Sequence, residues 1–248
     1  IMFLIVGLAQ GITAGFTVLT SQRFGAKDTN GVKRSVANGI LLSLISTFLL
    51  TTFSVLSMHW ILTKMNTPAN IFQDAYTYIM IISGGLITTI FYNLLSSYLR
   101  AVGNSQIPLV FLVFSAVLNV ILDLILIIKF RMGVAGAGYA TILSQGISAV
   151  LCFLYIYRYM PDLTPQKEHW KFHLADTRHQ LSVGIPMALQ FAITASGTMI
   201  MQSAINLFGS DAVASFTAAG KLQTLVTQGM MAMGQTMAAY SGQNFGKG

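Results

Sequence analysis

Seven long apolar runs, each bounded by charged or strongly polar residues, constrain the fold more than any other feature of this sequence. They cover residues 1–20, 36–58, 75–99, 107–128, 133–157, 181–208 and 212–240. A helix of roughly 20 residues crosses the ~30 Å hydrocarbon core of a bilayer. Lipid offers no partners to free backbone N–H and C=O groups, and the runs are much longer than barrel strands of roughly ten alternating residues. We therefore predict an all-α integral membrane protein with about seven transmembrane helices.

The shortage of charged residues excludes most other classes of protein. Charged side chains make up 8% of the chain and hydrophobic ones 54%, whereas a soluble domain carries about 25% charged residues. The single Cys152 excludes a disulfide framework or a cysteine metal cluster. Four histidines and seven acids leave few ligands for a catalytic metal site. We expect no enzymatic activity, no cofactor and no resident metal centre.

Basic residues predict the orientation in the membrane. If the connection after the first run is cytoplasmic, ten cations lie inside, and only Lys64, Lys129 and Arg131 lie outside. The ten are Arg23, Lys27, Lys33, Arg34, Arg100, Arg158, Lys167, Lys171, Arg178 and Lys247. This bias follows the positive-inside rule and accounts for the net charge of +7 without a nucleic-acid partner. The expected surroundings are a lipid bilayer, namely the plasma membrane of a bacterium.

The hydrophilic stretch after the fifth run predicts a boundary between two lobes. We assign residues 1–157 to a first lobe, 158–180 to a cytoplasmic linker and 181–248 to the start of a second lobe. The chain opens inside an apolar run and stops directly after another. We expect it to be a fragment of about half of a longer protein.

A short motif occurs twice and indicates an internal repeat. Gln22-x-Phe24-Gly25 recurs as Gln243-x-Phe245-Gly246, each time directly after an apolar run. Six runs separate the copies, so both copies face the same side of the membrane. That pattern predicts a parallel repeat of six helices, and hence about twelve helices in the whole protein.

Asp123 is the strongest candidate for a functional residue. A carboxylate within an apolar run costs roughly 2.5–3.5 kcal/mol on insertion scales and usually faces protein or water. Asn119 lies one turn earlier on the same helix face. Asp123 and Thr141 are each nine residues from Met132, so an antiparallel helix pair brings them to a similar depth. Such a group can exchange a proton or Na⁺, although a hydrogen-bond network that only packs helices is the alternative.

Other polar groups at membrane depth are candidates for lining a cavity. Gln145 lies one turn beyond Thr141, and Gln190 belongs to the sixth run. Lys221 lies within the seventh run, where its amine can instead reach the interface. Interhelical hydrogen bonds are the alternative role for both amides.

Five spaced motifs resemble the MATE family of multidrug and toxic compound extrusion transporters. They are Thr20-Ser-Gln22-Arg-Phe24-Gly25-Ala26, Leu99-Arg100-Ala101-Val-Gly103-Asn104-Ser105, Leu118-Asn119-Val-Ile-Leu122-Asp123, Gly133-Val-Ala-Gly136-Ala-Gly138-Tyr-Ala140-Thr141 and Gly184-Ile-Pro186. The resemblance covers essentially the whole chain. It implies a twelve-helix, two-lobed carrier, of which this chain holds helices two to eight.

The resemblance also implies a mechanism and a site. A MATE carrier exports cationic or amphipathic compounds by alternating access, in exchange for H⁺ or Na⁺. Asn119, Asp123 and Thr141 match the first-lobe cation site of the DinF-like branch, with Na⁺ possible at Asp123. That branch also uses an Asp on the first helix, which this chain does not contain. The NorM-like branch has a Glu where this chain reads Gln190-Phe-Ala-Ile-Thr194, so the first-lobe site is favoured.

Three other functions remain open from the sequence. A flippase of lipid-linked saccharides would usually line its cavity with several basic residues. A membrane-embedded enzyme would need a nucleophile–base pair or a ligand cluster at depth, and all four histidines lie outside the runs or at their edges. A non-transporting membrane protein is the third alternative. We expect a monomeric secondary active exporter of small amphipathic or cationic compounds.

Overall fold

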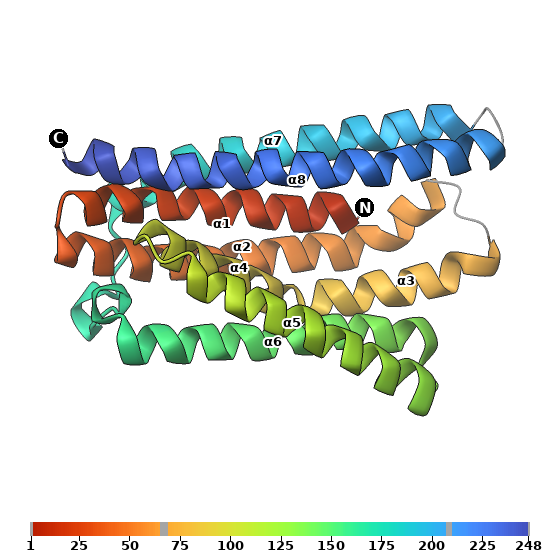
Figure 1. Cartoon of the computed structure of the whole chain (residues 1–248), viewed down its shortest axis with the longest axis horizontal. Coiled ribbons are helices and arrows are strands. Elements are labelled where there is room, and N and C mark those ends of the chain that lie inside the picture. Colours follow the sequence, from red (N-terminus) through yellow and green to blue (C-terminus); the bar gives the residue numbers. More distant parts are fainter. Residues whose placement is uncertain (1, 65–68, 207–209, 248) are drawn as a thin grey trace.

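The computed structural model describes residues 2–64, 69–206 and 210–247, which form long helices that run along one common direction (Figure 1). None of these residues forms a β-strand. The helices are α1 (Met2–Gly25), α2 (Thr29–Lys64), α3 (Ala69–Gly84), α4 (Leu86–Ala101), α5 (Gln106–Asp123), α6 (Gly133–Tyr159), α7 (Leu174–Asn206) and α8 (Ser210–Lys247). A π-helix (Leu124–Lys129) extends α5, and two short 3₁₀ helices (Pro161–Leu163 and Lys167–His169) follow α6.

The helices confirm the predicted all-α membrane fold. Five of them are long and apolar enough to cross a membrane, or six when the bent pair α3–α4 counts as one span. The helix α8, which covers the seventh predicted run, is outside this set and is the least hydrophobic of the eight. The predicted runs therefore coincide with helices, although the last one carries many amides and glycines.

The predicted single span over residues 75–99 is wrong in one respect, because it consists of two helices. The axes of α3 and α4 bend by 50° at the junction of Gly84 and Gly85. A Cβ atom on Gly85 would lie 2.3 Å from the Ile142 side chain of α6. The bend thus occurs where α6 packs directly against backbone, and only glycine leaves room for it.

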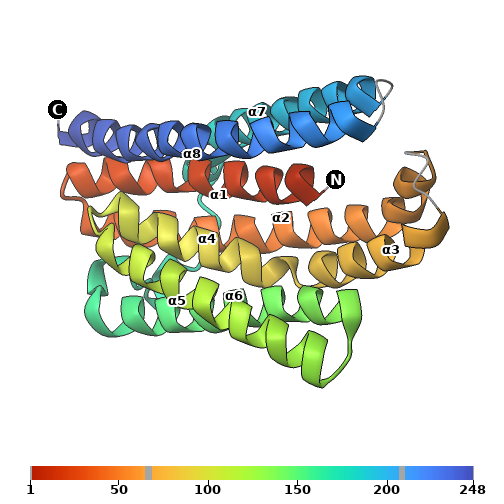
Figure 2. The same ribbon diagram turned by 45° about the vertical axis from the view of Figure 1, so that its right-hand side comes forward.

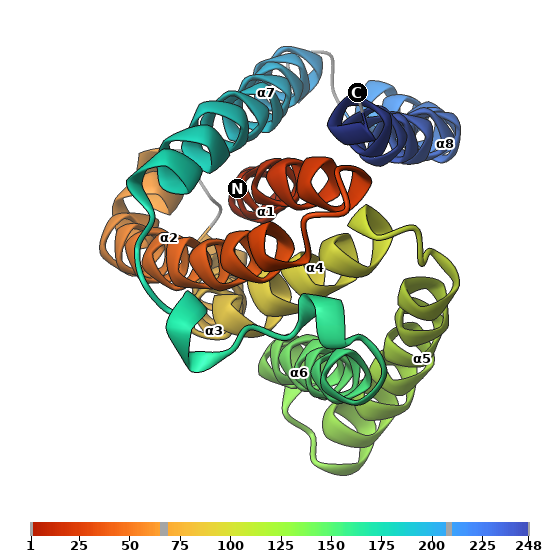
Figure 3. The same ribbon diagram turned by 90° about the vertical axis from the view of Figure 1, so that its left-hand side faces the viewer.

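The α5–α6 hairpin packs on the side of the bundle away from α7 and α8 (Figure 2). The connection from α6 to α7 runs from residue 160 to residue 173, inside the longer linker that we predicted over 158–180. In the end view of Figure 3, α1 lies among α2, α4, α7 and α8, and it contacts all four. The helix α1 is therefore the central element of the chain.

Three glycines on α1 form the contact with α7. Gly7, Gly11 and Gly15 recur every fourth residue, so they share one helix face. A Cβ atom on Gly11 would lie 2.7 Å from the backbone of Ala188, and one on Gly15 would lie 2.3 Å from the Cα atom of Gly184. The two helices therefore approach with their backbones nearly touching, as small-residue motifs allow in membranes.

The two copies of the repeated motif meet at one end of the molecule. Here α1, α4, α6 and α8 end, with Arg23, Arg100, Arg158 and Lys247 in their last turns, and we call it the basic end. A Cβ atom on Gly25 would lie 1.8 Å from the carbonyl oxygen of Gln243. Reciprocally, a Cβ atom on Gly246 would lie 1.8 Å from the carbonyl oxygen of Gln22. The ends of α1 and α8 thus cross through matching glycines, as expected of two helices related by the predicted repeat.

A buried polar network ties α7 to α1 and α2 near the basic end. The fully buried Gln180 donates from Nε2 to the carbonyl oxygens of Phe16 (3.1 Å) and Ser35 (2.9 Å). Its Oε1 accepts a hydrogen bond from Asn38 Nδ2 at 2.7 Å. The buried Asp176 accepts hydrogen bonds from Arg34 Nε at 2.8 Å and from an Arg23 guanidinium nitrogen at 3.4 Å. This network fixes the start of α7 on the first two helices.

Replacing Gln180 by Leu is expected to destabilise the protein by about 1–3 kcal/mol, because buried groups lose their hydrogen-bond partners. The melting temperature of the full-length protein in detergent measures the effect. Gln106→Leu changes an exposed glutamine at the start of α5 and serves as the control. Equal melting temperatures for the two variants would contradict a stabilising role for the network.

Candidate functional site

Asp123 and Asn119 lie one turn apart at the end of α5, and they share a property that is otherwise found only at five serine hydroxyls in the described part of the chain. Asp123 Oδ1 and Asn119 Nδ2 are both buried, and neither has a hydrogen-bond partner. A buried polar atom without a partner costs about 1–3 kcal/mol, and more when it is charged. Folded proteins leave few such atoms, so each one needs an explanation. The unpartnered carboxylate oxygen can accept a proton or a cation, whereas the Asn119 Nδ2 group can only donate a hydrogen bond.

The backbone around Asp123 is also irregular. The π-helix Leu124–Lys129 begins at the next residue. Single π-turns inside α-helices often occur at functional sites. The glycine face of α6 packs against this π-helix, since a Cβ atom on Gly136 would lie 3.2 Å from the backbone of Leu126. Counting along the antiparallel pair from this contact places Asp123 at about the level of residue 139.

Thr141 and Gln145 follow on α6, but their side chains are engaged elsewhere. Thr141 Oγ1 donates a 2.9 Å hydrogen bond to the carbonyl oxygen of Ala137. Gln145 Oε1 accepts a hydrogen bond from Thr89 of α4. The structure therefore brings Thr141 close to the level of Asp123 without a hydrogen bond between them. Gln145 instead joins α6 to α4.

A cavity of about 420 Å³ is lined by residues of α1, α4, α7 and α8. Gln190 lies in its wall, whereas the side chain of Lys221 falls outside the described part of the chain. The remaining lining residues are Ala14, Thr17, Val18, Ser21, Ser97, Arg100, Ala101, Met187, Phe191, Met230, Met231, Gly234, Gln235, Ala238 and Ala239. The volume is within the ~300–1,000 Å³ of sites for drug-sized ligands.

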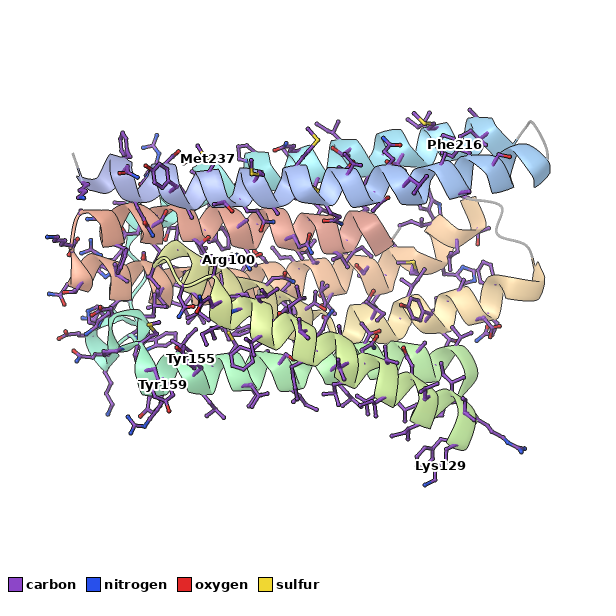
Figure 4. The ribbon with its side chains drawn as sticks, viewed as in Figure 1. Arg100, Lys129, Tyr155, Tyr159, Phe216 and Met237 are labelled. Carbon is purple, nitrogen blue, oxygen red and sulfur yellow. The ribbon has the colours of Figure 1, made fainter. Side chains whose placement is uncertain are left out.

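Sequence reasoning missed Arg100 as a lining residue, because it counted this arginine only as a topological charge. Figure 4 places Arg100 on α4, near the basic end. Ser97, which lies one turn before Arg100, was a sequence signal for a buried arginine. An arginine that ends an apolar run can pair with a hydroxyl group on the same helix face. Within the described ranges, no three His, Cys, Asp or Glu side chains gather in a way that could hold a metal ion.

Comparison with known proteins shows the family to which the chain belongs. The MatE family model matches residues 1–125, just over half of the chain. The probable multidrug resistance protein YpnP of Bacillus subtilis is 32% identical over 251 residues, which cover 100% of this chain and 55% of YpnP. YoeA of the same organism, also described as a probable multidrug resistance protein, is 22% identical over 99% of this chain and 55% of YoeA. The chain thus spans about half the length of these relatives.

Solved structures share the fold. An outward-facing MATE family multidrug resistance transporter superposes with a TM-score of 0.90 at 22% identity, over 99% of this chain and 55% of that one. An inward-facing structure of a MATE family transporter gives a TM-score of 0.80 at 22% identity, over 98% of this chain and 59% of that one. With its apolar helices and bacterial relatives, the chain is part of a multi-pass plasma-membrane protein. It belongs to the MatE family.

Proposed function

We propose that this chain forms part of a monomeric secondary active exporter of small amphipathic compounds, which exchanges them for H⁺ or Na⁺ by alternating access. The observation that carries the proposal is the half-buried Asp123, whose buried Oδ1 has no hydrogen-bond partner, one turn from the buried and unpartnered Nδ2 of Asn119. An ionisable residue within a membrane span marks an ion pathway or proton relay by default. Carboxylate, amide and hydroxyl oxygens are also suitable ligands for a hard cation such as Na⁺.

Binding of the ion is expected to change which conformation is favoured. An ion moves a two-state equilibrium only through its different affinities for the two states. A carboxylate whose oxygen lacks a partner in this conformation has more to gain from a proton or Na⁺ than a carboxylate that is already paired. Fold relatives with outward-facing and inward-facing structures support a carrier that alternates between two states. The role of Thr141 in this site and the DinF-like assignment stay predictions.

The cavity supports a substrate of drug size but favours no cationic group. Its described walls contain methionine, phenylalanine, amides and one arginine, and they contain no carboxylate. Flipping of lipid-linked saccharides is the second candidate function, because Arg100 adds a basic residue that sequence reasoning did not count. Several basic lining residues are expected of a flippase, and the described walls hold one.

Reconstitution of the full-length protein into liposomes tests the proposal. Rhodamine 123 and fluorescein serve as probes, and their release is followed under a pH gradient or a Na⁺ gradient. We expect one of the two gradients to accelerate release of at least one dye. No acceleration under either gradient would contradict coupled export. Faster bleaching of a fluorescent phospholipid by external dithionite, without dye release, would favour the flippase.

A further inference from the structure

The cavity between α1, α4, α7 and α8 combines an apolar surface with one charged group among its described residues. Met187 and Phe191 of α7 face it from one side, and Met230 and Met231 of α8 from another. Flexible methionine side chains adapt to ligands of different shape, which suits a site for bulky apolar molecules. Among the described residues that line it, Arg100 is the only charged one.

The guanidinium of Arg100 lacks an acidic partner. Its one hydrogen bond within the described chain runs from Nη2 to Ser97 Oγ, at 2.9 Å. The ion pairs found among residues 2–64, 69–206 and 210–247 involve Arg23, Arg34 and His169, so no described carboxylate lies within 4.0 Å of Arg100. A guanidinium has five N–H donors in a planar fork. Most of these donors have no hydrogen-bond partner within the described chain.

Neutral donors extend the polar part of the cavity. Gln190 of α7 and Gln235 of α8 line the same cavity as Arg100 of α4. Amides bind anions as well as neutral oxygens through their NH₂ groups. A partly desolvated guanidinium binds a carboxylate or phosphate more strongly than an exposed one does, because charge-assisted hydrogen bonds strengthen as water is removed. No group in the described walls offers a matching negative charge to a cation.

We infer that this cavity binds amphipathic anions, with the acidic group held by Arg100 and the apolar body against the methionines and Phe191. The term substrate for such a molecule rests on the proposed export function, whereas binding itself does not. The sign of the charge is opposite to the cationic substrates that the family resemblance led us to expect. The shared ligand chemistry is a carboxylate, sulfonate or phosphate attached to an apolar body.

Equilibrium binding to the full-length protein in detergent tests this inference. Fluorescein and rhodamine 123 share a xanthene ring system but carry opposite charges, and fluorescence anisotropy reports the binding of each. Wild-type protein is expected to prefer fluorescein. Arg100→Gln is expected to weaken fluorescein binding about tenfold or more, equivalent to about 1.4 kcal/mol. The same change should leave rhodamine 123 binding unchanged or tighter, and Arg100→Lys should restore part of the affinity for fluorescein.

Arg158→Gln is the matched control, because it removes the same charge at the same end of the molecule. Arg158 is exposed at the end of α6, with its guanidinium carbon 5.6 Å from the centre of the Tyr159 ring. This variant should bind both dyes like wild type. Equal fluorescein affinity in Arg100→Gln and Arg158→Gln, or a wild-type preference for rhodamine 123, would overturn the inference.

A competition experiment with lipids distinguishes the binding of a free compound from the binding of a lipid headgroup. Phosphatidylglycerol added in mixed micelles should compete with fluorescein if the cavity accepts a lipid phosphate, and phosphatidylcholine should not. Competition identifies an anionic lipid as the ligand, and its absence identifies a free amphipathic anion. Arg100-dependent binding without gradient-driven release would refute the proposed export but not this inference. Coupled release of rhodamine 123, together with fluorescein binding that does not depend on Arg100, would support the proposed export and refute this inference.

Discussion

Adding one methyl group at Gly25 or Gly246 is expected to open the basic end of the protein and to slow export by about tenfold. In this structure the ends of α1 and α8 are in contact, which we call the closed state. Each added Cβ atom would lie 1.8 Å from a backbone carbonyl oxygen of the opposite helix. Backbone atoms cannot move aside as a flexible side chain can, so α1 and α8 have to separate. Overpacking of this kind costs typically 1–3 kcal/mol, and here the cost falls on the closed state alone. About 1.4 kcal/mol shifts the equilibrium between two conformations tenfold.

Spin labels at Asn30→Cys, at the start of α2, and at Lys247→Cys, at the end of α8, report the opening, because both positions are exposed and Asn30 follows α1 after a short turn. The native Cys152 is buried and is not expected to take up label. Gly25→Ala and Gly246→Ala should lengthen the distance between the labels. Gly229→Ala is the matched control on α8, where an added Cβ atom would meet nothing within 4 Å and which does not line the cavity. If all three variants share the wild-type distance and export rate, the glycine crossing does not control closure.

The sequence predicts helices well in this chain because the membrane restricts the alternatives so strongly. Apolar runs between charges located the spans, and the repeated Gln-x-Phe-Gly motif correctly indicated that α1 and α8 end on the same side. Contacts between those helices were not predictable, because spacing along the chain does not say which faces meet. The reciprocal contact of Gly25 and Gly246 therefore appears only in three dimensions.

Departures from regular helix left weaker signals. The bend at Gly84 and Gly85 depends on Ile142, which is far away in sequence and fills the space beside Gly85. The π-helix that begins at Leu124 has no proline or glycine in it or in the preceding 15 residues to mark it. Arg100 was counted only as one of the cytoplasmic charges that set the membrane orientation, because its position at the end of an apolar run does not reveal the cavity beside it. In each case a neighbouring helix supplies the missing information.

Replacing Asp123 by Asn is expected to abolish the acceleration of export by an ion gradient while leaving the fold intact. Asparagine keeps the shape of aspartate but neither releases a proton nor balances the charge of Na⁺. Neutralising a buried carboxylate whose Oδ1 lacks a partner removes a desolvation cost, so the melting temperature should stay equal or rise. Equilibrium binding of fluorescein should change by less than about twofold, equivalent to about 0.4 kcal/mol, since Asp123 does not line the cavity.

Two further variants separate ion coupling from helix packing at Asp123. Asp74→Asn neutralises an exposed acid on α3 and should retain full gradient-driven release, because that carboxylate is already solvated. Thr141→Val removes a hydroxyl group whose hydrogen bond stays within α6, and a partial loss of coupling would place its oxygen in the ion site. Gradient-driven release at the wild-type rate in Asp123→Asn would refute the coupling role. Lost release together with a lower melting temperature would instead assign Asp123 to packing, because neutralising a residue that serves only ion coupling should not weaken the contacts between the helices.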